Sequence, residues 1–456
     1  MQLSATQLCV VQMHYEDSLT LNKIDQLWVF AILFINGWNF ALPVTNYPIP
    51  IWFTVVQPLH GIYINELLLI TYLVFWIIKR HGRFLLIRRN DERFLTFLII
   101  GLGCLGVLSN GANNQPIKEM GEAGRFFLLA AYFSLLIHWA IKYSATFVLR
   151  TLLLGIACAG AVNLYYSVSI VEREMGGLPL LLGQNGPGGI LGISVVFSAW
   201  LMLGRNTTFD SVVALTTLII GVLAASISYS KLSMLMAGFG LIAWGGVLYS
   251  NLVKSRRTRR LTSLMLIVVA VIAFVNMERI SLYADGVNKL IEYKFHDLGE
   301  GNQSVMSRSQ YFVIVADIIS SHPILGVGYA GFYKAAIATE GYRSEKSAEE
   351  DPESGQAGLS NPHNSFLYYA SANGLPGLII VMLLFAITLR IFWRTLSALE
   401  LPGKILWMCL AGSYFIYGMT LPSLFNTSIL YLPAAIAVAL KESEKLTHCR
   451  LIPAKT

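Results

Sequence analysis

The residues best suited to chemistry lie in a short polar stretch, Asn361-Pro362-His363-Asn364-Ser365, that precedes an apolar segment. A neutral imidazole can take a proton from a hydroxyl group near pH 7, so His363 is the candidate general base. Pro362 stiffens the chain before the histidine, and Asn364 can cap a short helix after it, which holds the ring on a fixed corner. The alternative interpretation is a half-buried polar histidine that only fixes the loop.

Three cations are candidates for binding a diphosphate group. Arg308 stands at the start of a helix predicted over 307–321 with Ser307 as its N-cap, and a guanidinium binds phosphate oxygens bidentately. Its alternative role is a salt bridge to an acid of the same loop. Lys231 and Arg125 each stand at the edge of an apolar segment. Their alternative role is that of an anchor whose charged end reaches the membrane surface.

Other polar groups are assigned smaller roles. In His322-Pro323-Ile-Leu-Gly326-Val-Gly328 the proline ends the predicted helix and the glycines permit a tight turn. We therefore assign His322, together with Asn364, to supporting the loop. The acidic run 349–353 is interpreted as a solvated charge run. The histidines lack metal-ligand spacing, and no phosphate-binding glycine loop occurs in a suitable context. The sequence predicts neither a metal site nor a cofactor.

These residues are positioned by an unusually apolar chain. Hydrophobic residues make up 55% of the 456 residues and charged residues only 13%, against about 25% charged residues in ordinary globular proteins. The apolar residues fall in runs of roughly 17 to 22, the length that crosses a ~30 Å hydrocarbon core as a helix. This pattern excludes a water-soluble enzyme, a disordered chain and a disulfide scaffold. It predicts an all-α polytopic membrane protein with about twelve transmembrane helices. The expected spans are 24–42, 62–80, 94–109, 125–142, 147–169, 187–204, 210–227, 231–250, 260–277, 373–394, 402–420 and 424–441.

The positive charges predict the orientation of these spans. Most of the 33 Lys and Arg residues fall in the tails and in the short loops on the same side as the tails, and positively charged loops stay in the cytoplasm. Both termini are therefore expected in the cytoplasm. The net charge of +7 arises from these loops, so nucleic acid is not an expected partner. The predicted organisation is a membrane region over 1–277, one large extracytoplasmic loop over 278–372, and a second membrane region with the cytoplasmic tail over 373–456.

The topology and the loop sequences together resemble the O-antigen ligase and polymerase family of bacterial surface polysaccharide assembly. Four features, within a ligase-like core of about 185–395, carry the resemblance. They are Arg308 before an apolar helix, His322-Pro323-Ile-Leu-Gly326-Val-Gly328, Pro362-His363-Asn364-Ser365-Phe366-Leu367, and Asn373-Gly374-Leu375-Pro376-Gly377 at the start of the next span.

The resemblance implies a metal-independent, inverting glycosyltransferase in the bacterial inner membrane that acts at its outer face. The donor is then a glycan on undecaprenyl diphosphate, and the acceptor is another glycan or lipid A-core. His363 matches the family's base, and Arg308 matches an arginine that holds the donor diphosphate. Lys231 stands where the family usually has arginine, so it keeps the charge and loses the bidentate geometry. Other polysaccharide assembly proteins are further expected partners.

The resemblance leaves two choices open. A polymerase extends one lipid-linked glycan with another, whereas a ligase delivers the finished chain to a different acceptor, and both need the same base and diphosphate contact. The alternative class is a twelve-span transporter or flippase of lipid-linked sugars. Transporters usually need ionisable groups near the middle of the bilayer, and most of the predicted spans contain no acid. A non-catalytic scaffold for other assembly proteins is a third interpretation.

Overall fold

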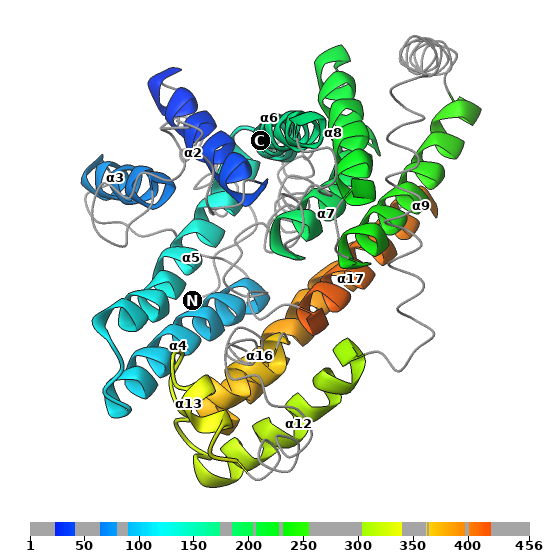
Figure 1. The fold of residues 1–456 in the computed structure, drawn as a ribbon. Helices are drawn as coiled ribbons and strands as arrows, with labels where there is room; N and C mark the ends of the chain where they lie inside the picture. The colour runs from blue at the N-terminus through cyan, green and yellow to red at the C-terminus, as the bar shows by residue number, and fades with distance from the viewer. Residues whose placement is uncertain are drawn as a thin grey trace.

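A computed structural model of the chain describes residues 23–41, 64–79, 90–173, 185–203, 207–227, 231–254, 303–339, 362, 364–396 and 401–420. In these ranges the regular secondary structure is entirely helical (Figure 1). The helices are α2 (Lys23–Ala41), α3 (Ile64–Lys79), α4 (Asn90–Ala112), α5 (Ile117–Lys142), α6 (Ala145–Arg173), α7 (Asn185–Leu203), α8 (Thr208–Ile227), α9 (Lys231–Lys254), α12 (Gln303–Ser321), α13 (Phe332–Ala336), α16 (Ser365–Leu396) and α17 (Leu401–Thr420).

Ten of the predicted spans coincide with described helices, namely α2 to α9, α16 and α17. Six of these helices, α4, α5, α6, α8, α9 and α16, are long and apolar enough to cross a membrane. The predicted spans 260–277 and 424–441 lie outside the described residues. The chain is thus a polytopic helical protein with several segments of membrane-spanning length, while the count of twelve spans and the extent of the long loop stay predictions.

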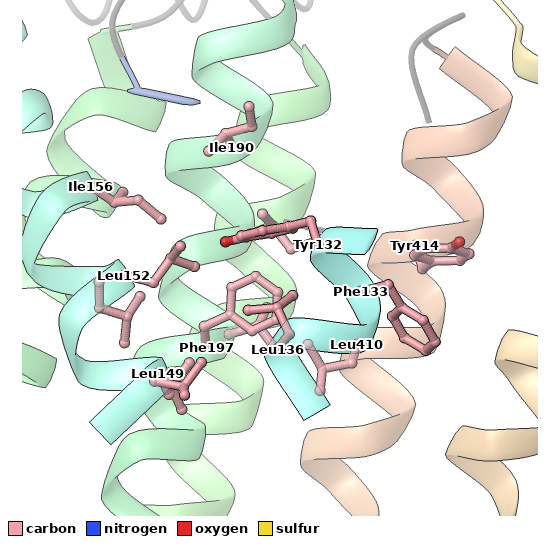
Figure 2. Packing of buried hydrophobic residues seen from close by; sticks show 14 of the residues in the cluster. Tyr132, Phe133, Leu136, Leu149, Leu152, Ile156, Ile190, Phe197, Leu410 and Tyr414 are labelled. Atoms are coloured by element: carbon pink, nitrogen blue, oxygen red, sulfur yellow. The ribbon is translucent and has the colours of Figure 1, made fainter. Parts of the chain in front are cut away.

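The bundle is held together by a hydrophobic core to which α5, α6, α7 and α17 all contribute. Figure 2 shows Tyr132 of α5, Leu152 of α6, Phe197 of α7 and Leu410 of α17 turned toward the space between these helices. All four side chains are almost completely buried. Because lipid tails are as apolar as these side chains, close packing rather than exclusion of water stabilises helix association inside a membrane.

Glycines allow α2 and α6 to cross in close contact. A Cβ atom on Gly37 would lie 2.2 Å from the carbonyl oxygen of Leu152, and one on Gly155 would lie 2.1 Å from that of Phe34. No side chain fits at those separations, so the two backbones approach directly. Small residues at a crossing are typical of membrane helix pairs, which gain van der Waals contact from the short distance.

Ion pairs between helix ends agree with the predicted order of crossings, because both partners of each pair fall on the same predicted side. The pairs are Lys142 Nζ with Asp25 Oδ2 at 2.6 Å, Arg150 Nη1 with Asp210 Oδ1 at 3.2 Å, and Arg125 Nε with Glu66 Oε1 at 2.9 Å. The first two pairs belong to the predicted inner side and the third to the predicted outer side. Which side faces the cytoplasm is predicted by the Lys and Arg distribution alone.

α12 belongs to the predicted extracytoplasmic loop but is apolar on two faces. One face packs into a small hydrophobic cluster with α13 and the start of α16, through Tyr311, Ile314, Val315 and Ile318. On the other face Phe312 is 53% exposed and Val313 is 54% exposed, and Ile324 beyond the helix is 69% exposed. Figure 1 shows α12 and α13 close to α16. We therefore expect the exposed face of α12 to contact lipid rather than water.

A spin label can test this expectation. With the five native cysteines replaced by serine, a label at Val313→Cys should collide more often with lipid-soluble oxygen than with a water-soluble nickel complex, because its face of α12 is apolar. A label at Lys334→Cys, an exposed charged position on α13, is the matched control and should show the opposite preference. Equal access of the nickel complex at both positions would place the α12 face in water.

Candidate functional site

The candidate site begins where α12 meets the loop that follows it. α12 starts at Gln303, so the prediction that Ser307 is its N-cap is wrong. Ser307 lies inside the helix, because nothing in the preceding residues stops helix formation one turn earlier. The end of the helix agrees with the prediction. His322 N still donates to Ile318 O at 2.8 Å, and Pro323, which has no N–H, follows it.

The glycines after Pro323 form the tight turn that the sequence predicted. Gly326 has φ 62° and Gly328 has φ 77°, both in the left-handed region that favours glycine. The turn closes with Gly326 N donating to His322 O at 3.1 Å. A Cβ atom on Gly326 would lie 2.4 Å from Ser371 O, so the absence of a side chain also lets the turn approach α16.

α16 is broken near its start. Gly374 has φ 66° and ψ −163°, which are not helical values, and Pro376 follows inside the helix. The residues 365–373 therefore form a short helix of their own, and the long apolar segment starts after the break. This is the arrangement that the sequence predicted, with a short helix before Asn373-Gly374 and with Pro376 opening the next span.

The break exposes backbone groups that the preceding loop then pairs. Pro376 cannot donate to Ala372 O, and Leu375 N donates to Pro323 O at 2.8 Å. The two carbonyls that are freed in this way bind the loop: Val327 N donates to Ser371 O at 2.9 Å and Gly328 N donates to Ala372 O at 3.0 Å. Three backbone hydrogen bonds thus join residues 323–328 to residues 371–375. We call this contact the junction.

The end of α4 contacts the same junction from a third side. Ser109 Oγ lies 2.5 Å from Leu325 O and 2.6 Å from Ala372 O. Tyr329 N donates to Asn110 Oδ1 at 2.9 Å. Sequence reasoning missed these residues. The available signal was the polar run Ser109-Asn110-Gly-Ala-Asn113-Asn114-Gln115 at the end of an apolar span, but nothing in it indicates which distant segment it contacts.

Asn364 caps the short helix, as predicted. Its Oδ1 accepts from Phe366 N at 2.8 Å and from Leu367 N at 3.2 Å, and its amide nitrogen lies 3.8 Å from Met419 Sδ of α17. Asn364 and Pro362 are both buried. His363 itself lies outside the described residues, so its role as a base stays a prediction. The structure does describe the residue before it and the residue after it, and both are buried.

For two of the three predicted cations the structure describes the position in a helix, and for the third it also describes a side-chain contact. Arg308 is in the second turn of α12 and Lys231 is the first residue of α9, whereas the directions of their side chains are not among the described features. Arg125 Nε forms the ion pair with Glu66 of α3, and both side chains are partly buried. The ion pair with Glu66 is a role that the sequence did not predict for Arg125, and both its membrane-surface anchoring and its diphosphate contact stay predictions.

Two further side chains lie near the junction. The His322 ring is exposed, and its Nδ1 lies 3.2 Å from Ser321 Oγ. The loop is therefore supported by the backbone of His322 more than by its ring. Tyr311 follows Arg308 by one helical turn and lies in the hydrophobic cluster that also includes Leu367 and Ala370 of the short helix. Burial raises the pKa of the Tyr311 phenol.

Substituting Gly374 should destabilise the junction. In Gly374→Ala the new Cβ would lie 2.5 Å from Pro323 O, and φ of 66° is unfavourable for alanine, so we expect a loss of about 1–3 kcal/mol in the free energy of unfolding. Thermal unfolding of the purified protein in detergent measures the effect. Gly238→Ala on α9, where a Cβ would meet no atom within 4 Å, is the matched control. Equal unfolding midpoints for both variants would contradict the strain assigned to Gly374.

Comparison with known proteins identifies the segment that contains most of this junction. Residues 216–382 match the family model described as O-antigen ligase. No curated protein matches the chain. The match includes α9, α12, α13 and the start of α16, and it ends before α17. It confirms the resemblance that the loop sequences carry: residues 216–382 are similar to the O-antigen ligase family.

Proposed function

We propose that this protein is a membrane glycosyltransferase that transfers a glycan from undecaprenyl diphosphate, as a surface polysaccharide polymerase or an O-antigen ligase. The observation that carries the proposal is the O-antigen ligase match over 216–382. Within that segment, hydrogen bonds join the 322–328 motif to the 362–377 motif. Two stretches that are more than 30 residues apart in the sequence thus form one corner at one end of the bundle.

The proposed reaction needs a base and a group that stabilises the leaving diphosphate. The acceptor hydroxyl oxygen attacks the anomeric carbon of the donor sugar, and the bond from this carbon to the diphosphate oxygen breaks. His363 takes the hydroxyl proton, and the Arg308 guanidinium binds the diphosphate as negative charge develops on it. Lys231 and Arg125 are proposed as further cations for the diphosphate. Neither a metal nor a cofactor is assigned to these steps.

The proposed site lies at the outer face of the inner membrane, with both termini in the cytoplasm. In the predicted topology the end of α4, the loop after α12 and the start of α16 all fall on the outer side. The structure brings these three ends together, which agrees with that topology. The expected partners are the lipid-linked donor, a glycan or lipid A-core acceptor, and other polysaccharide assembly proteins.

Removal of the proposed base is the first test. His363→Ala should abolish the transfer product while the protein reaches normal abundance in the membrane, because the hydroxyl proton has no acceptor. The assay uses purified protein with lipid-linked oligosaccharide, with and without lipid A-core. Longer lipid-linked chains without lipid A-core would indicate a polymerase, and a product that requires lipid A-core would indicate a ligase. His448→Ala in the C-terminal tail is the control, and an unchanged glycan profile in His363→Ala would defeat the catalytic assignment.

Substitution of Arg308 tests the proposed contact between its guanidinium and the donor diphosphate. We expect Arg308→Lys to lose nearly as much activity as Arg308→Ala, because lysine keeps the charge but cannot bind two oxygens in the bidentate geometry. The measurement is kcat/KM for the lipid-linked donor. Arg390→Lys, at an exposed position near the other end of α16, is the matched control. Full activity in Arg308→Lys would mean that a simple charge contact is sufficient.

A further inference from the structure

Ser109 is a buried polar residue near the end of α4 that contacts two segments of the junction. Its side chain is completely buried. Its hydroxyl has one proton, yet it lies within hydrogen-bond distance of two carbonyl oxygens, Leu325 O at 2.5 Å and Ala372 O at 2.6 Å. One acceptor belongs to the loop after α12 and the other to the short helix that begins α16. A single hydroxyl thus connects three segments that are far apart in the sequence.

The residues after Ser109 continue the contact along the loop. Asn110 Oδ1 accepts from the backbone of Tyr329, as described above, and two more side chains donate to consecutive loop carbonyls. Asn113 Nδ2 donates to Gly326 O at 3.2 Å, and Gln115 Nε2 donates to Val327 O at 3.2 Å. Four side chains of one helix end therefore hold most of the backbone from residue 325 to residue 329. A Cβ atom on Gly328 would lie 2.9 Å from Asn110 Oδ1, so this fit tolerates no side chain at that point.

The short helix that Ser109 contacts also fixes the chain next to His363. Asn364 caps its first turn, and Ala372 O, which Ser109 reaches, lies at its end. Ala372 lies near the end of this short helix and Asn364 caps its start, so a displacement of the helix at Ala372 also displaces Asn364. We propose that the polar end of α4, with Ser109 at its centre, is a positioning element for transfer, because it holds the short helix that follows the proposed base His363 in the sequence. This inference rests on the proposed function.

The size of the effect follows from the geometry that proton transfer requires. A reacting group displaced by about 1 Å can lower a rate by about a hundredfold. Ser109→Ala leaves one hydrogen-bond donor for Ala372 O, from Gly328 N, and removes the side-chain donor to Leu325 O. The junction then loses its connection to α4 at this point while its own backbone hydrogen bonds remain. We therefore expect a displaced but folded site.

The kinetic experiment compares Ser109→Ala with the wild-type protein in nanodiscs, with lipid-linked oligosaccharide as donor. We expect kcat per folded molecule to fall by about ten- to a hundredfold, with KM for the donor and the pH midpoints of kcat unchanged. Ser109→Thr, which keeps the hydroxyl, should recover part of the loss. Ser194→Ala is the matched control, because in the part of the chain that the structure describes its buried hydroxyl donates to Leu191 O of its own helix. A purely structural role would lower the amount of folded protein but not kcat per folded molecule.

Hydrogen exchange supplies a readout that does not need activity. The amides of Val327 and Gly328, which pair with Ser371 O and Ala372 O, should exchange faster in Ser109→Ala than in Ser194→Ala. If Ser109→Ala does not fold, Gln115→Ala, at a partly exposed position, takes its place with a smaller expected fall in kcat.

Three results would overturn parts of this account in distinguishable ways. An unchanged kcat in a folded Ser109→Ala or Gln115→Ala, with active wild-type protein, would exclude the positioning role alone. A raised KM for the donor with kcat intact would mean that the end of α4 contacts substrate directly, which also excludes positioning. If the wild-type protein forms no transfer product from either acceptor, the proposed function fails, and the positioning role fails with it.

Discussion

The carbonyl oxygen of Ala372 is the group on which the candidate site depends. In an unbroken helix it would accept from the N–H of residue 376, but proline at that position has none. Gly328 N at 3.0 Å and Ser109 Oγ at 2.6 Å supply donors instead. A buried carbonyl without a donor is unfavourable by about 1–3 kcal/mol. The helix break, the loop after α12 and the end of α4 therefore stabilise one another through this carbonyl.

The same constraint explains how a polar corner can exist in so apolar a bundle. Membrane proteins accept a broken helix only where neighbouring segments pair the backbone groups that the break releases. Here two backbone amides and a serine hydroxyl do this. In such surroundings hydrogen bonds are stronger than in water, so these bonds restrain the backbone of the loop and of the helix break. A restrained corner of this kind is what the proposed base would need to meet a hydroxyl group at a fixed distance.

Local signals in the sequence predicted the helices and the breaks, and they did not predict the contacts between them. Runs of apolar residues located ten described helices, Pro323 and Pro376 located helix ends, and the cap formed by Asn364 followed from its position before Ser365. The first turn of α12 was missed because Ser307 is compatible with both a cap and a helix interior. The pairing of Ser109 with Ala372 joins residues 263 positions apart. Only packing decides such a pair, since any polar helix end is suitable by composition.

The hydrogen bonds between the end of α4 and the loop after α12 also decide whether residues 216–382 can be transferred to another protein without the rest of the chain. The matched segment starts at residue 216, whereas Ser109, Asn110, Asn113 and Gln115 precede it by about a hundred residues. Excised or grafted alone, the segment would carry a loop whose carbonyls and amides lack their partners in α4 and in the residues just after it. A chimera that exchanges acceptor preference between relatives therefore has to transplant the α4 terminus with the domain, or choose a recipient whose third predicted span ends in the same polar residues.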